Sequence, residues 1–320
     1  MKIDKVIFTS SYSPDYIDFW NLNSKLYKEE LGITPELYLF GDPSSVSAAR
    51  IPESSSIAIS DNRSGEVSEK YGKVFYIDFL PNLPEIVQIV TWKFYHTQSE
   101  PDTTWIIGDI DQIPLPNGAR KHFIDQIKDV PEDYYLHLAH NSISEHIGES
   151  GDYWRSGTYP GDRYYLAVLA GHYHVAKGST FKQFLDLDCS FEDWIKPMIK
   201  EWYEDHPQGR NMSEDAFSNM SDKELKSEID NNPGIMWAYE ESYTSNKLRG
   251  KLHFNRFKGF DRPMDKKICR STGCAYDPSL LKEGHYVDIH CPRPFYGKAS
   301  GPSNEKNSDL IISLVKEASQ

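Results

Sequence analysis

Trp105-Ile106-Ile107-Gly108-Asp109-Ile110-Asp111 is the stretch that decides how this chain is interpreted. It begins as an apolar run typical of a buried strand and ends abruptly in acidic residues. Because Asp109 and Asp111 are two residues apart, an extended segment would point both carboxylates to the same side. Two such carboxylates can hold Mg²⁺ or Mn²⁺ and leave positions open for substrate phosphates. The alternative is a strand end with two solvated acids, since a D-x-D pattern also occurs by chance.

The composition indicates an ordered globular protein that does not bind nucleic acid. The chain has 320 residues, of which 13% are aromatic and 26% charged, enough for one large or two small domains. Its formal net charge is −13, so the chain lacks the excess of positive charge that is typical of a general nucleic-acid binder. An acidic protein that binds an anionic phosphate ligand needs a metal ion or a few well-placed cations.

Cysteine content and hydropathy bear on the compartment. Four cysteines in 320 residues argue against a disulfide framework. No apolar run approaches the length of a membrane span. We therefore expect a soluble, cytoplasmic protein without a membrane span.

Strand-like and helix-like segments alternate from the start of the chain. A strand at Val6–Ser10, a helix from Pro14 to about Leu31 and a strand at Glu36–Phe40 predict a right-handed parallel crossover in an α/β fold. Later segments continue the alternation, with expected strands at 74–77, 134–138 and 164–175 and expected helices at 84–98, 118–129 and 180–206.

The helix expected at 84–98 carries a cation on its apolar face. Ile86, Ile89, Val90 and Thr97 share this face, and Lys93 falls on it as well. Lys93 is either a lysine whose aliphatic stem covers apolar surface or a cation close to the acidic segment that follows.

Residues 145–163 form a long segment with several aromatic and arginine residues, among them Tyr153, Trp154 and Tyr159. Such a composition favours a binding loop over a plain linker. Aromatic rings suit the C–H faces of sugars.

Three further stretches extend the pattern: Leu169-Ala170-Gly171-His172-Tyr173-His174-Val175-Ala176, Ser213-Glu214-Asp215-Ala216-Phe217 and Tyr286-Val287-Asp288-Ile289-His290-Cys291-Pro292-Arg293-Pro294-Phe295. Together with the D-x-D segment, and in this order, they resemble the GT-A class of nucleotide-sugar-dependent glycosyltransferases. The resemblance spans roughly residues 5 to 297. It implies a Rossmann-like α/β fold with a mixed, mainly parallel central sheet flanked by helices.

The resemblance also implies a domain plan. Residues 1–300 would form a single catalytic domain, with a nucleotide-binding half at about 1–115 and an acceptor-binding half at about 116–300. Residues 301–320 would form a tail with a short helix.

Metal and phosphate ligands follow from the resemblance. Asp111 would bind Mn²⁺ or Mg²⁺ directly, Asp109 would contact the metal or the ribose, and His290 would complete the metal shell through a neutral ring nitrogen. Arg293 would grip phosphate oxygens, and Lys93 would be a second cation of the donor site. The segment Tyr286–Phe295, which contains His290 and Arg293, departs from the commoner form of the family, which has glycine and lysine before the proline.

The acidic pair near the middle of the chain has two explanations. Ser213 would cap a helix, and acids in the first turn suit the helix dipole, which is a sufficient structural role. The resemblance implies instead that Asp215, with Glu214 as second choice, is the general base that deprotonates the acceptor.

The first strand ends in Thr9, Ser10, Ser11 and Tyr12. In this fold, that position faces the nucleobase and ribose. Hydroxyls there could hydrogen-bond the base edge, and Tyr12 could stack on it. Ordinary loop chemistry is the alternative.

The leading functional hypothesis is a metal-dependent glycosyltransferase. It would move a sugar from a nucleoside diphosphate sugar, with UDP favoured, to a hydroxyl acceptor such as a glycan, with retention or inversion left open. A non-catalytic nucleotide- or sugar-binding protein on the same fold is the alternative. A metal-dependent hydrolase is the third hypothesis, although the chain has neither a His-Glu-x-x-His pattern nor a Walker-type loop; it would use His137, His140, His146, His172 and His174.

Overall fold

The computed structural model describes residues 1–12, 14–41, 67–139, 146–147, 153–154, 169, 171–205, 220–231, 239–262, 266–269 and 277–291. The chain forms two compact units, each assembled from segments that alternate along the sequence. Unit 1 comprises Met1–Asp78, Gly108–Asp129 and Pro263–Gln320, and unit 2 comprises Phe79–Ile107 and Val130–Arg262.

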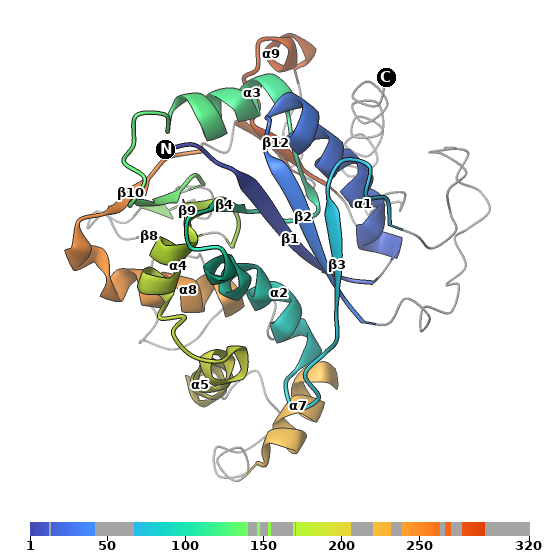
Figure 1. The fold of residues 1–320 in the computed structure, drawn as a ribbon, viewed down its shortest axis with the longest axis vertical. Coiled ribbons are helices and arrows are strands. Elements are labelled where there is room, and N and C mark those ends of the chain that lie inside the picture. Colours follow the sequence, from blue (N-terminus) through green and yellow to red (C-terminus); the bar gives the residue numbers. More distant parts are fainter. Residues whose placement is uncertain are drawn as a thin grey trace. The chain divides into compact units, whose positions relative to one another are not determined.

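Unit 1 contains three neighbouring parallel strands: β1 (Lys5–Ser11), β2 (Thr34–Phe40) and β3 (Lys73–Ile77) (Figure 1). Their residues are largely β-branched or aromatic, which suits a pleated, buried surface. Phe8 lies opposite Leu37, and Leu37 lies opposite Val74. The parallel pairing expected for the first two strands is therefore confirmed.

The crossover between β1 and β2 contains helix α1 (Pro14–Lys25), which continues as the π-helical turn η1 (Leu26–Glu30). It ends at Gly32, whose φ of 70° lies in the left-handed region that glycine adopts without strain. Trp20 and Tyr27 pack edge-on against Phe8, with ring centroids 6.1 and 5.5 Å away. These three fully buried rings form the centre of the unit 1 core.

A second, smaller sheet in unit 1 joins distant parts of the chain. Strand β5 (Gln112–Pro114) pairs antiparallel with β12 (Asp288–His290), which pairs parallel with β11 (Lys267–Cys269). The remaining described elements of unit 1 are short: α3 (Pro116–Arg120), η4 (Lys121–Asp125) and α9 (Pro278–Lys282).

Four neighbouring strands of unit 2 follow the order β10 (Phe257–Gly259), β6 (Tyr135–His137), β9 (His174–Lys177) and β4 (Thr104–Ile107). The β10–β6 pair is parallel, and β9 runs antiparallel to both β6 and β4. A separate two-stranded ribbon consists of β7 (His146–Ile147) and β8 (Tyr153–Trp154).

Helices make up the rest of the described part of unit 2. Helix α8 packs against α2 and α4, and α2 also packs against α5. Their bounds are α2 (Glu85–His96), η3 (Thr97–Ser99), α4 (Gly178–Leu185), α5 (Phe191–Asp205), α7 (Asp222–Asn231), α8 (Tyr239–Gly250) and η7 (Leu252–Phe254).

The expected fold class, an α/β chain with a mixed and mainly parallel sheet flanked by helices, is confirmed. Of the five pairings described among β1, β2, β3, β4, β6, β9 and β10, three are parallel and two are antiparallel. Among the helices in the described ranges, none combines the length and apolar character needed to cross a membrane.

Candidate functional site

The two acids of the D-x-D pattern lie in a turn. Strand β4 ends at Ile107, and the N–H of Gln112 donates to the carbonyl oxygen of Asp109 at 3.0 Å. This i to i+3 hydrogen bond closes a β-turn over residues 109–112. The expectation of an extended segment through Asp111 was therefore wrong, and its two side chains do not follow the alternation of a strand.

Both ends of this turn are fixed within unit 1. The N–H of Gly108 donates to the carbonyl oxygen of Ile7 in β1 at 2.9 Å. The N–H of Cys291, directly after β12, donates to the carbonyl oxygen of Asp111 at 2.9 Å. In the β5–β12 pairing, Gln112 lies opposite His290. The register of this short sheet thus places His290, from late in the chain, beside Asp111.

Asp111 and His290 are in contact, as the metal prediction requires. His290 Nε2 lies 3.4 Å from Asp111 Oδ2, with 20% of the histidine side chain and 8% of the aspartate side chain exposed. A carboxylate oxygen and an imidazole nitrogen are suitable donors for Mn²⁺. Two donors on adjacent octahedral positions, each about 2.1 Å from an ion, are roughly 3 Å apart, close to the observed spacing. The pair therefore fits a divalent cation.

Asp109 is half-buried at the start of the turn. Across the described part of the chain, no three His, Cys, Asp or Glu side chains are grouped so that they could hold one ion. The structure thus brings together two of the three predicted metal ligands, Asp111 and His290. The contact of Asp109 with metal or ribose stays a prediction.

The residues predicted to contact the nucleobase lie on opposite sides of β1. Because β1 extends to Ser11, Thr9 and Ser11 face one side of the sheet and Ser10 faces the other, and Tyr12 directly follows the strand. The Tyr12 ring lies beside that of Tyr76, with centroids 6.5 Å apart, and Tyr76 is 51% exposed. Sequence reasoning missed Tyr76. Leu39 of β2 lies opposite Ser10 of β1 and opposite Tyr76 of β3, so the three residues form one row across the strands.

Lys93 lies on α2 in unit 2 and is 3% exposed. The buried face of α2 matches the expected one only in part: Lys93 and Thr97 are buried as expected. Ile86, Ile89 and Val90 are half-buried, whereas the buried positions are Val87, Gln88, Thr91, Lys93 and Phe94. A role of Lys93 toward the donor stays a prediction.

Several predicted residues lie outside the described residues. These are Glu214, Asp215 and Arg293, together with Ser213 and Tyr159. Their roles stay predictions. Tyr153 and Trp154, from the expected binding loop, form β8, in which they lie opposite Ile147 and His146.

His172 and His174 in unit 2 contact different partners. His174 Nδ1 lies 3.0 Å from the hydroxyl of Tyr135, and burial raises the pKa of that tyrosine well above its ordinary value. Arg262 Nη2 donates to His172 Nε2 at 3.1 Å, so this ring nitrogen carries no proton. Both contacts are buried. The packing explains these two histidines as structural residues of unit 2.

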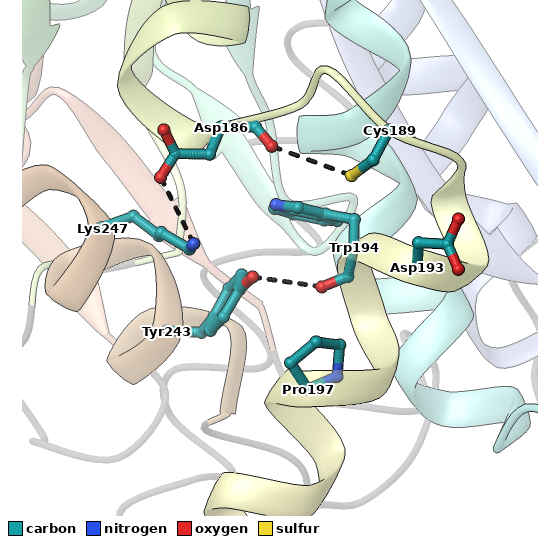
Figure 2. Close-up of a pocket in the computed structure, with 7 residues that line it drawn as sticks. All are labelled: Asp186, Cys189, Asp193, Trp194, Pro197, Tyr243 and Lys247. Atoms are coloured by element: carbon teal, nitrogen blue, oxygen red, sulfur yellow. Dashed lines mark hydrogen bonds and ion pairs between the residues drawn. The ribbon is translucent and has the colours of Figure 1, made fainter.

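Unit 2 contains a pocket of about 250 Å³ whose lining is shown in Figure 2: Asp186, Cys189, Asp193, Trp194, Pro197, Tyr243 and Lys247. Its walls are held by two hydrogen bonds, from Trp194 Nε1 to the carbonyl oxygen of Leu185 and from the Tyr243 hydroxyl to that of Trp194. The carboxylate of Asp186 pairs with Lys247 at 3.3 Å and with Lys251 at 2.7 Å. The sequence carried no signal for this pocket, because its lining comes from the segment between α4 and α5, from α5 and from the distant α8.

No family profile and no curated protein sequence matches this chain. Two solved structures of the galactosyltransferase LgtC are similar to it: a complex with donor and acceptor sugar analogs, and an active-site mutant. Each covers 97% of this chain and 95% of its own, with 13% sequence identity and a TM-score of 0.43. A galactosyltransferase is a glycosyltransferase, the class that the sequence resembles. A likeness of this size assigns neither a family nor an activity.

Proposed function

We propose that this protein is a metal-dependent glycosyltransferase that moves a sugar from a nucleoside diphosphate sugar to a hydroxyl acceptor, such as a glycan. The observation that carries the proposal is the contact between Asp111 and His290. The two residues are separated by more than half of the chain, and the β5–β12 pairing brings them into contact, which supports the metal site that the sequence pattern predicts. UDP is the favoured donor nucleotide.

In this proposal Asp111 and His290 bind Mn²⁺ or Mg²⁺, and Asp109 contacts the ion or the ribose. When bound, the cation neutralises the donor diphosphate and stabilises the departing nucleoside diphosphate. Low exposure of Asp111 keeps water away from its carboxylate, which strengthens its interaction with a cation.

The nucleoside would lie at the carboxyl ends of β1 and β3. Binding at the carboxyl ends of parallel strands is general in open α/β sheets. Tyr12 and the exposed Tyr76 offer ring faces to a base, and the hydroxyls of Thr9, Ser10 and Ser11 line the end of β1 on both sides. Rings that stack on a base contribute binding without requiring one particular base.

The cations that would bind phosphate and the base that would accept the proton are proposed from the sequence alone. Arg293 and Lys93 would contact phosphate oxygens as cations. Asp215, with Glu214 as second choice, would accept the proton of the attacking acceptor hydroxyl. A protein that binds the donor without catalysis would not depend on Asp215, so this residue discriminates between the two hypotheses.

Calorimetric titration of UDP and GDP, each with and without Mn²⁺, tests the proposal. Wild type should bind one nucleotide only with Mn²⁺, and Asp111→Ala should abolish that binding. Asp129→Ala, which removes an exposed carboxylate of the same unit, is the matched control and should bind as wild type does. Absence of nucleotide binding by wild type under every metal condition would exclude the proposal.

A further inference from the structure

One side chain of α1 reaches the middle of the acidic turn. Asn23 is fully buried, and its Nδ2 donates to the carbonyl oxygen of Ile110 at 2.6 Å. Ile110 is the residue between the two acids of the D-x-D pattern. The contact lies within unit 1, where α1 also packs against β5, the strand that continues from the turn.

This hydrogen bond complements the backbone bonds that fix the turn. Gly108 and Cys291 bind the two ends, and Gln112 closes the turn on itself. The amide of Asn23 adds a side-chain hydrogen bond to the turn, and it restrains the peptide that orients Asp111. A free carbonyl there would leave the peptide able to rotate, which would move the carboxylate relative to His290.

Asn23 carries a cost in folding free energy at this position. Within the described part of the chain, its Oδ1 is buried without a hydrogen-bond partner. A buried polar atom in that state opposes folding, and an apolar side chain of similar size would avoid the cost. The bond to Ile110 is the compensating contact, and it is directed at the candidate metal site.

We propose that Asn23 is a positioning residue that holds the Asp109–Gln112 turn and thereby sets the affinity of Asp111 and His290 for a divalent cation. The inference rests on the proposed function, because it gives the turn a ligand. Asn23 itself does not touch the ion. It acts through the backbone of Ile110.

The test compares Asn23→Leu, which keeps the size of the side chain but has no donor, with Ser24→Ala. Ser24 is also buried on α1, and its hydroxyl donates to the carbonyl oxygen of Asn21 at 3.2 Å rather than to the turn. Mn²⁺ binding in the presence of UDP is measured by electron paramagnetic resonance. We expect roughly tenfold weaker Mn²⁺ binding in Asn23→Leu and unchanged binding in Ser24→Ala.

A second readout needs no ligand. Hydrogen exchange of the Gln112 and Cys291 amides should be faster in Asn23→Leu than in Ser24→Ala, because both amides bind the turn. If Asn23→Leu does not fold, Asn23→Ser replaces it, since the shorter hydroxyl does not reach the Ile110 carbonyl.

The outcomes separate this inference from the proposed function. Unchanged Mn²⁺ affinity in a folded Asn23 variant, even one with lowered stability, would overturn the inference and leave the function intact. Equal exchange rates in the Asn23 and Ser24 variants would also overturn it. Failure of the function would be seen in wild type, which would then bind no Mn²⁺ with either nucleotide.

Discussion

Gly108 lies so close to the ring of Phe8 that a Cβ on it would be 2.4 Å from Phe8 Cε1. Phe8 cannot retreat, because Trp20 and Tyr27 pack against the same ring. The residue before the acidic turn is therefore a glycine for steric reasons, and the core of unit 1 bears directly on the position of the turn.

Gly108→Ala should destabilise the protein by about 1–3 kcal/mol, the usual cost of extra volume in a packed core. Urea unfolding measures the change. Gly250→Ala is the control, because a Cβ at Gly250 meets no atom within 4 Å, and it should leave stability unchanged or raise it. Gly108→Ala should cost less stability in a Phe8→Leu background than in wild type, because the smaller side chain leaves room for the added Cβ. Equal effects at Gly108 and Gly250 would contradict the steric explanation.

Replacing His290 tests its role as a metal ligand. His290→Ala should weaken Mn²⁺ binding in the presence of UDP by roughly tenfold or more, because loss of a metal ligand costs at least as much as loss of its supporting hydrogen bond. The exposed His253, in η7, provides His253→Ala as the control. Equal Mn²⁺ affinities in the two variants would show that the contact with Asp111 is structural.

The ion pairs of Asp186 should make stability depend on pH. Burial raises the pKa of this carboxyl, but hydrogen bonds and charges from Lys251 and Lys247 outweigh it, so the pKa lies below its ordinary value. A lowered carboxyl pKa stabilises the folded state above the unfolded pKa of about 4, and this stability disappears as pH falls through the folded pKa.

Asp186→Asn should therefore reduce stability at pH 7 but not in acid. The loss should stay below about 1 kcal/mol, because 45% of the side chain is exposed and solvent screens the pairs. Asparagine tolerates the left-handed φ of 55° at this position, so the change isolates the charge. Urea unfolding between pH 7 and pH 3 measures the difference in stability between this variant and wild type. The control is Asp188→Asn, which removes the charge of a more exposed ion pair with Lys182. A difference that grows toward low pH would refute this assignment.

A buried carboxylate in β2 depends on one lysine. Glu36 Oε1 lies 2.8 Å from Lys5 Nζ, and Oε2 accepts a hydrogen bond from the Tyr38 hydroxyl at 3.0 Å. Lys5→Met should cost about 3 kcal/mol, because it leaves a buried charge without its counterion. The double variant Lys5→Met with Glu36→Gln should lose less, and a double-mutant cycle in urea measures the coupling. An additive cycle would show that the pair contributes nothing.

Local patterns were enough to predict much of the secondary structure. The strands β1, β2 and β3 and the helices α1 and α2 follow from apolar runs bounded by proline and glycine, and they lie within a few residues of their expected positions. The buried face of α2 was predicted only in part, and it includes Gln88, whose amide donates to the carbonyl oxygens of Leu80 and Leu83. A polar side chain buried in this way cannot be recognised from periodicity.

The candidate site was predictable in its residues but not in its geometry. Resemblance named Asp111 and His290 as partners, and the β5–β12 register brings them together. The turn at Asp109–Gln112 was missed because the preceding apolar run continues the strand pattern, whereas the break depends on hydrogen bonds to distant residues. Asn23 and Tyr76 were missed for the same reason, since only tertiary packing relates them to the site.

The alternating segments of unit 1 affect the order of events during protein synthesis. When Asp111 leaves the ribosome, β12 has not been made, and His290 follows only after more than half of the chain has been added. At ordinary elongation rates this delay is roughly 10 to 35 s, far longer than the formation of a helix or hairpin. The nascent chain therefore carries an incomplete site for most of its synthesis. Expressed fragments that stop before residue 288 should acquire neither β12 nor metal-dependent nucleotide binding.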